Sequence, residues 1–233
     1  MEQVVAHAVK ARRSFLSGIG AAFAAVGIGA GRAAAQSTQA ATPFKPATHK
    51  EDEWLAEIPG KHRVVIDATM PNSAGSAVLY AGNLFNTNKT AYGLADTDLA
   101  IVIVMRHNAT PFAFNDTLWA KYGAAMSTIL DFTDPKTKAP PSTNLYNSKN
   151  YGLALTNLGT TISSVTDRGA VIAICDLATH FASSGIARAL NAKADDVYAD
   201  FKANPLPHTR FVSAGVNAVT RAQELGYTLI YAG

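Results

Sequence analysis

Hydrophobic and polar positions follow two alternating patterns along most of the chain, and the alternation predicts an α/β fold. Short apolar runs rich in β-branched residues are typical of strands, and apolar residues repeated every three or four positions are typical of helices. Five strand-like runs lie at residues 63–68, 98–105, 170–174, 209–213 and 227–231, with helix-like segments between them. Strands that alternate with helices form mainly parallel sheets. We therefore expect one three-layer α/β domain with a mainly parallel five-stranded sheet.

The segments between the runs predict helices. Val78, Ala81, Gly82 and Phe85 share one face of the first helix. Further helices are expected at residues 115–130, 153–167, 195–203 and 216–225, and after Cys175, where Ala178, Phe181, Ala182, Gly185 and Ala189 share a face. Residues 131–152 show no periodicity and contain three prolines. A loop this long in a compact domain is usually functional, a subunit contact or mobile.

The first 35 residues predict an export signal. Arg12 and Arg13 precede an apolar stretch rich in Gly and Ala, which ends in Arg32 and three alanines. This arrangement resembles a bacterial twin-arginine (Tat) signal cleaved near Ala35. A membrane anchor is the alternative, but the apolar stretch is shorter than the ~20 residues that span a bilayer. We expect export by the Tat machinery, a periplasmic mature protein without a membrane span, a flexible tether at residues 36–50 and the folded domain at 51–233.

The charge of the chain argues against a polyanionic partner. Four of the 20 basic residues but only one of the 17 acidic residues lie in the predicted signal, so cleavage would leave 16 of each. A chain without net charge and without a basic run interleaved with aromatics is not expected to bind nucleic acid.

Polar residues that end the predicted strands indicate where a site should lie. Parallel sheets bind ligands beyond the carboxyl ends of their strands, where Asp67, Arg106, His107, Cys175 and Ser213 would meet. Cys175, the single cysteine, cannot form an internal disulfide. Its place before a helix favours the thiolate, the nucleophilic form of the side chain. Arg106 and His107 would stabilise the negative charge of the thiolate, and His180 lies five residues after Cys175. Alternatively, Cys175 is a small core residue and the histidines only cap or pack.

The segment between the second strand and the next helix is rich in polar and aromatic side chains. We consider Arg106, His107, Asn108, Asn115 and Trp119 as candidates for binding a small ligand. In the alternative interpretation Asn115 caps the helix and Trp119 fills the core. Motifs for metal binding or serine hydrolysis, such as HExxH, CxxC and GxSxG, do not occur, and we expect neither a metal site nor a cofactor.

The C-terminal half resembles the DsrE/DsrF-like family of small sulfur-relay proteins. The resemblance rests on the strand that ends in Cys175, on Gly185 and Ala189, and on the segments TRFVSAGV (209–216) and AQELGY (222–227). It covers residues 62–233. Residues 112–122 and the predicted signal also resemble those of exported members of the family, whose function is uncharacterised. The resemblance implies a flavodoxin-like fold, homotrimers or hexamers, and a persulfide carried at Cys175.

Three functions are compatible with these observations. The first is an exported thiol protein that binds or relays a small sulfur species through Cys175, as a sulfurtransferase or a sulfur carrier. The alternative is a non-catalytic, oligomeric module that binds a small ligand or a partner chain at the same rim. A third reading is an oligomeric scaffold in which the rim has no role.

Overall fold

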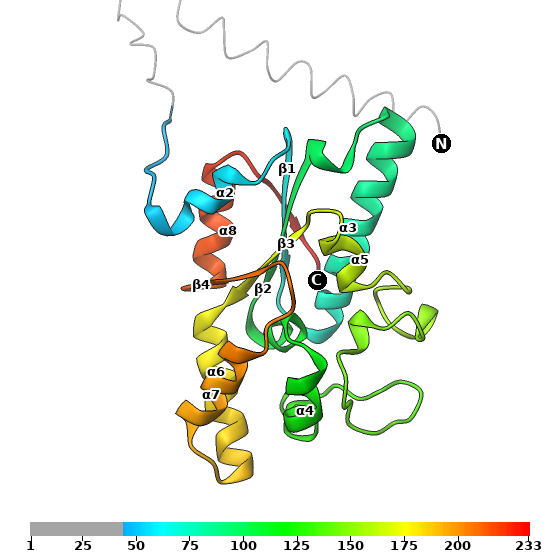
Figure 1. The fold of residues 1–233 in the computed structure, drawn as a ribbon, viewed down its shortest axis with the longest axis vertical. Helices are drawn as coiled ribbons and strands as arrows, with labels where there is room; N and C mark the ends of the chain where they lie inside the picture. The colour runs from blue at the N-terminus through cyan, green and yellow to red at the C-terminus, as the bar shows by residue number, and fades with distance from the viewer. Residues whose placement is uncertain (1–43) are drawn as a thin grey trace, which may run out of the picture. The chain divides into compact units, whose positions relative to one another are not determined.

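The five strands of the sheet lie where the hydrophobic runs predict them. They are β1 (His62–Ala68), β2 (Leu99–Met105), β3 (Val171–Cys175), β4 (Thr209–Val212) and β5 (Thr228–Tyr231). The computed structural model describes residues 44–233, so the predicted signal and residues 36–43 of the tether lie outside the described residues. All neighbouring strands pair in parallel, in the order β4-β3-β2-β1-β5 (Figure 1). The predicted three-layer, flavodoxin-like α/β fold is confirmed.

Strand β2 lies at the centre of the sheet because it can be buried on both faces. All seven of its side chains are buried. Alternate residues point to opposite faces of a strand, and here they enter two separate cores. Ile101, Ile103 and Met105 join one core, and Ala100, Val102 and Val104 join the other.

Helices cover both faces of the sheet. In Figure 1, α2 (Glu53–Glu57) and α8 (Gly215–Glu224) lie on one side, and α3 (Pro71–Tyr92) and α5 (Ile162–Thr166) lie on the other. Helices α4 (Asp116–Leu130), α6 (Asp176–Leu190) and α7 (Ala194–Ala203) lie towards the carboxyl ends of the strands. Short 3-10 segments complete the chain: η1 (Lys50–Asp52), η2 (Asp96–Asp98), η3 (His107–Ala113), η4 (Leu145–Asn147) and η5 (Gly152–Ala154). No helix of residues 44–233 has the length and hydrophobicity to cross a membrane.

The first long helix forms as its sequence predicts. Val78, Ala81, Gly82 and Phe85 of α3 are all buried. The Ser73 hydroxyl accepts hydrogen bonds from the backbone of Thr69 and Met70 and fixes the turn from β1 into the helix.

The prediction of a helix over residues 153–167 is wrong for most of its length. Only Ile162–Thr166 form an α-helix, because Leu158 and Gly159 have positive φ angles and interrupt any helix before them. Thr161 then starts the helix, since its hydroxyl accepts a hydrogen bond from the Ser164 amide.

The long segment 131–152 packs against the core although it has little regular structure. Phe132, Leu145 and Tyr146 are buried, and the Tyr146 ring lies 4.9 Å from that of Phe112. Asn144 fastens the segment to the loop after β2, because its side-chain amide donates hydrogen bonds to the carbonyls of Phe112 and Phe114. The segment therefore supports the loop that begins with His107.

Candidate functional site

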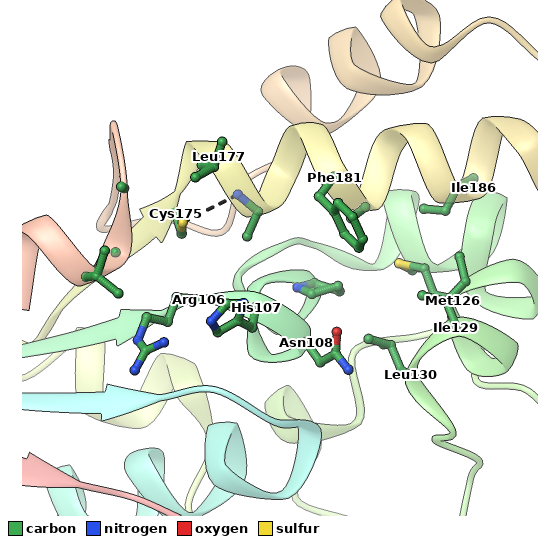
Figure 2. Close-up of a pocket in the computed structure, with 16 residues that line it drawn as sticks. Arg106, His107, Asn108, Met126, Ile129, Leu130, Cys175, Leu177, Phe181 and Ile186 are labelled. Carbon is green, nitrogen blue, oxygen red and sulfur yellow. Dashed lines mark hydrogen bonds between the residues drawn. The ribbon is translucent and has the colours of Figure 1, made fainter.

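Arg106 and Cys175 lie at the carboxyl ends of two neighbouring strands. Met105 of β2 pairs with Ile174 of β3. The residues that come next in the chain, Arg106 and Cys175, therefore lie at the same edge of the sheet. Both line a groove of about 520 Å³ (Figure 2). This volume is within the range of small-molecule sites.

The groove has a polar end and a long apolar remainder. It lies between α6 on one side and η3 and α4 on the other, and the start of α8 closes its polar end. The lining residues are Arg106, His107, Asn108, Pro111, Met126, Ile129, Leu130, Cys175, Leu177, Ala178, Phe181, Ala182, Ile186, Ala214, Gly215 and Val216. The four with polar side chains are the first three and Cys175. Figure 2 shows Arg106, His107 and Cys175 near one end of the groove and Asn108 further along it, beside Leu130.

The topology of the sheet explains why a groove opens here. Helix α6, which follows β3, contributes Ile186 and Ala187 to one core, whereas α8, which follows β4, contributes Ala218 and Ala222 to the other. The chain thus leaves two adjacent strands towards opposite sides of the sheet. Open α/β sheets leave a crevice at such a reversal, beyond the carboxyl ends of the strands.

Cys175 is the residue that precedes the first turn of α6. Its sulfur accepts a hydrogen bond from the Ala178 amide at 3.4 Å, as an N-capping side chain does. The residue is only 6% exposed, and the sulfur faces the polar end of the groove. The sulfur therefore lies at the end of α6 where backbone amides point towards a side chain or a ligand.

Arg106 provides a fixed positive charge beside the thiol. Its Nε and Nη2 atoms donate to the two carboxylate oxygens of Asp67, at 2.8 and 2.9 Å. This hydrogen bonding raises the pKa of Arg106 above its usual value, and the charges of Asp67, Tyr231 and Cys175 act in the same direction. Since Asp67 already balances the guanidinium, Arg106 adds little net charge to the groove.

Helix α8 can approach Arg106 only because it begins with a glycine. A Cβ atom at Gly215 would lie 2.7 Å from the Cβ of Arg106 and 3.1 Å from a methyl group of Val104. The glycine therefore sets the width of the polar end of the groove.

His107 and Asn108 begin η3 and form the floor of the groove. His107 has a φ of 50°, a conformation that is uncommon for residues other than glycine. The Ala109 amide fixes this turn by donating to the carbonyls of Thr69 and Arg106. Such strained positions often cluster at functional sites.

Three further candidates from the sequence lie outside the groove. His180 stacks on Tyr198 of α7, with ring centroids 3.8 Å apart, on another side of α6. Asn115 caps α4 by accepting hydrogen bonds from the Thr117 and Leu118 amides. Trp119 is fully buried, and its indole donates to the Pro111 carbonyl.

The apolar wall of the groove was not predicted from the sequence. Leu177 and Phe181 of α6 line it and are 66% and 76% exposed, which is unusual for large hydrophobic side chains. The predicted helical face containing Ala178, Phe181 and Ala182 does exist, but it borders the groove. The side of α6 that packs into the protein carries Thr179, Ser183, Ile186 and Ala187. The sequence signal that could have indicated this wall is the pair of small polar residues, Thr179 and Ser183, on the buried side of α6.

Within residues 44–233, no three His, Cys, Asp or Glu side chains gather in a group that could hold a metal ion. Comparison of the sequence with models of known protein families finds no match, and neither does comparison with curated proteins.

Proposed function

We propose that this protein is an exported thiol protein that binds or relays a small sulfur species through Cys175. The observation on which the proposal rests is the position of the Cys175 sulfur. Cys175 receives a backbone hydrogen bond at the start of α6 and borders a groove together with Arg106, His107 and Asn108. The resemblance to sulfur-relay proteins supports the same role.

The proposed reaction is a transfer of sulfane sulfur, the sulfur bonded only to other sulfur or to hydrogen. The Cys175 thiolate attacks the terminal sulfur of a polysulfide, and a new S–S bond forms. A polysulfide that is one sulfur shorter leaves with the electron pair of the broken bond. The Ala178 amide, which donates to the Cys175 sulfur, can stabilise the persulfide that results. No oxidant is needed, because the polysulfide is itself reduced.

The test is the mass of the intact protein after incubation with inorganic polysulfide. Wild-type protein should gain one sulfur atom, and Cys175→Ala should gain none, since the chain has no other cysteine. His180→Ala serves as the matched control because His180 lies on α6 but outside the groove; it should load like wild type.

The rate of loading separates an active thiol from a merely accessible one. Folding protects a buried, inert cysteine, so such a residue reacts more slowly in the native protein than in the chain unfolded by urea. We expect the reverse here, because the folded site supplies the Ala178 amide at the start of α6. Slower loading of the native protein, or no loading, would contradict the proposal.

Ligand binding without sulfur transfer is the second candidate. It is favoured by the exposed apolar side chains of Leu177, Phe181 and Val216 in the groove. In this case Cys175→Ser would keep the thermal stabilisation that a ligand gives, whereas His107→Ala would reduce it. Failure of Cys175→Ser to be stabilised would exclude this candidate.

A further inference from the structure

We infer that the sulfur compound taken by this site is an organic persulfide with an aliphatic or aromatic body, which lies in the apolar groove while its outer sulfur reaches Cys175. The inference rests on the proposed function and names the class of its substrate. It follows from the length, the lining and the charge of the groove.

The groove is much larger than an inorganic sulfur species requires. It has a volume of about 520 Å³ and follows α6 from Cys175 to Ile186. At a rise of 1.5 Å per residue, these eleven steps correspond to about 16 Å. A sulfide or short polysulfide would occupy only the end beside Cys175, so the rest of the groove is available for a carbon skeleton.

Beyond its polar end, the groove is lined mainly by apolar side chains. Leu177, Phe181 and Ile186 come from α6, and Met126 and Ile129 come from α4. Leu177, Phe181 and Ile129 are partly or largely exposed to solvent in the described chain. Covering such side chains with an apolar ligand is favourable by about 25 cal/mol for each Å² removed from water.

The charge of the groove disfavours a highly charged sulfur carrier. Of the described residues that line it, none is a carboxylate, and its one permanent cation, Arg106, is already paired with Asp67. A peptide thiol such as glutathione would have to place carboxylates and an ammonium group against apolar walls. Such charges lose hydration without gaining partners.

The transfer balances without a further reactant. The Cys175 thiolate attacks the outer sulfur of R–S–SH, and a bond forms between Sγ and that sulfur. The bond between the two sulfurs of R–S–SH breaks, and the organic thiolate R–S⁻ leaves with the electron pair. It then takes a proton from water, while Cys175 keeps the S–SH group.

A series of alkyl persulfides tests the substrate class. The rate of loading of Cys175 should rise from ethyl to butyl to hexyl persulfide by about two- to fourfold per added methylene group, the factor expected for its burial. Glutathione persulfide should load more slowly than hexyl persulfide. Equal rates along the series, or faster loading from glutathione persulfide, would overturn the inference.

Two exposed positions on α6 give a matched pair of variants. Phe181→Ser should flatten the dependence on chain length, because it removes part of the apolar wall that the carbon chain would contact. Leu190→Ser changes an exposed leucine of the same helix that does not line the groove, and it should behave like wild type. A full chain-length dependence in Phe181→Ser would contradict the inference.

Binding to a variant without the thiol separates the two claims. Hexanethiol should raise the melting temperature of Cys175→Ser more than ethanethiol does, since recognition of the carbon body does not need the sulfur of the protein. Absence of this difference would overturn the inference, even if polysulfide loads wild-type protein. Its presence in a protein that no persulfide can load would instead locate the failure in the proposed sulfur transfer.

Discussion

Arg106 joins the stability of the protein to its candidate site. Its guanidinium holds the carboxylate of Asp67, which is 5% exposed, with two short hydrogen bonds. The same side chain lies beside Cys175 and against Gly215. Removal of a single partner from such an ion pair leaves an uncompensated buried charge.

Arg106→Met should therefore lower the free energy of unfolding by about 3–5 kcal/mol. Asp67→Asn in the same chain should restore part of this loss, because the neutral amide needs no cation. Urea unfolding measures both effects. Arg188→Met is the control, since Arg188 is exposed near the end of α6, and it should change stability by less than about 0.5 kcal/mol. An unfolding free energy of Arg106→Met equal to that of wild type would refute the role given to the pair.

Among the elements, α4 shows how closely the segment 131–152 is packed. A Cβ atom on Gly123 would lie 1.9 Å from the carbonyl oxygen of Pro141, which belongs to the backbone and cannot rotate away. On α6, by contrast, a Cβ atom on Gly185 would meet only the tip of Ile129, at 3.4 Å. Gly123 is therefore packed tightly against the backbone of the segment 131–152, whereas Gly185 has room for a methyl group.

Substitution of these two glycines by alanine should have opposite effects. Gly123→Ala should destabilise the protein by about 1–3 kcal/mol, because the segment must move away from the helix. Gly185→Ala should stabilise it by about 0.5–1 kcal/mol, since alanine is the better helix former. Thermal and urea unfolding measure both. A Gly123→Ala protein as stable as wild type would mean that the segment does not rest on α4.

The elements also show what the sequence could and could not predict. The strands were predictable because β-branched runs such as residues 99–105 can be buried only in the middle of a sheet. The helix expected before Ile162 was not formed, since tertiary packing placed Leu158 and Gly159 at positive φ. A periodic pattern reports which residues share a face, but it does not report what that face meets.

For the whole molecule, the pKa values predict stability that falls at both ends of the pH range. A hydrogen bond from Arg168 lowers the pKa of Asp96, and one from Lys121 lowers that of Asp200. Because unfolding returns these groups to about 3.8, the stabilisation is complete above about pH 4 and is lost as the pH falls further. At high pH, burial and a hydrogen bond to Asp176 raise the pKa of Tyr198 to about 12. Its contribution is complete below pH 10.0, its usual value, and is lost as the pH rises towards 12.

The urea midpoint should thus be level near neutral pH and decrease below about pH 4 and above about pH 10. Asp96→Asn should give a shallower acid decrease, because one of the lowered carboxyl groups is removed. Tyr198→Phe should likewise give a shallower alkaline decrease. A midpoint that stays constant down to the lowest pH measured would contradict the first expectation.

At this scale the candidate site was only partly predictable. Of the residues that the rule for parallel sheets placed at one rim, Arg106, His107 and Cys175 line the groove, whereas Ser213 does not. The rule could not place His180, Asn115 or Trp119, because the direction in which α6 and α4 leave the sheet depends on packing between distant segments. The same packing creates the apolar wall, whose members come from separate stretches of chain, among them α4 and α6.

The recessed position of Cys175 has a consequence for copies of the protein that meet in solution. A disulfide requires two Cβ atoms to approach to about 4 Å. Cys175 is only 6% exposed, and its sulfur lies inside the groove rather than on the surface of the protein. Two folded copies cannot bring their Cys175 side chains this close while the groove keeps its shape, so we expect no disulfide between copies of the protein.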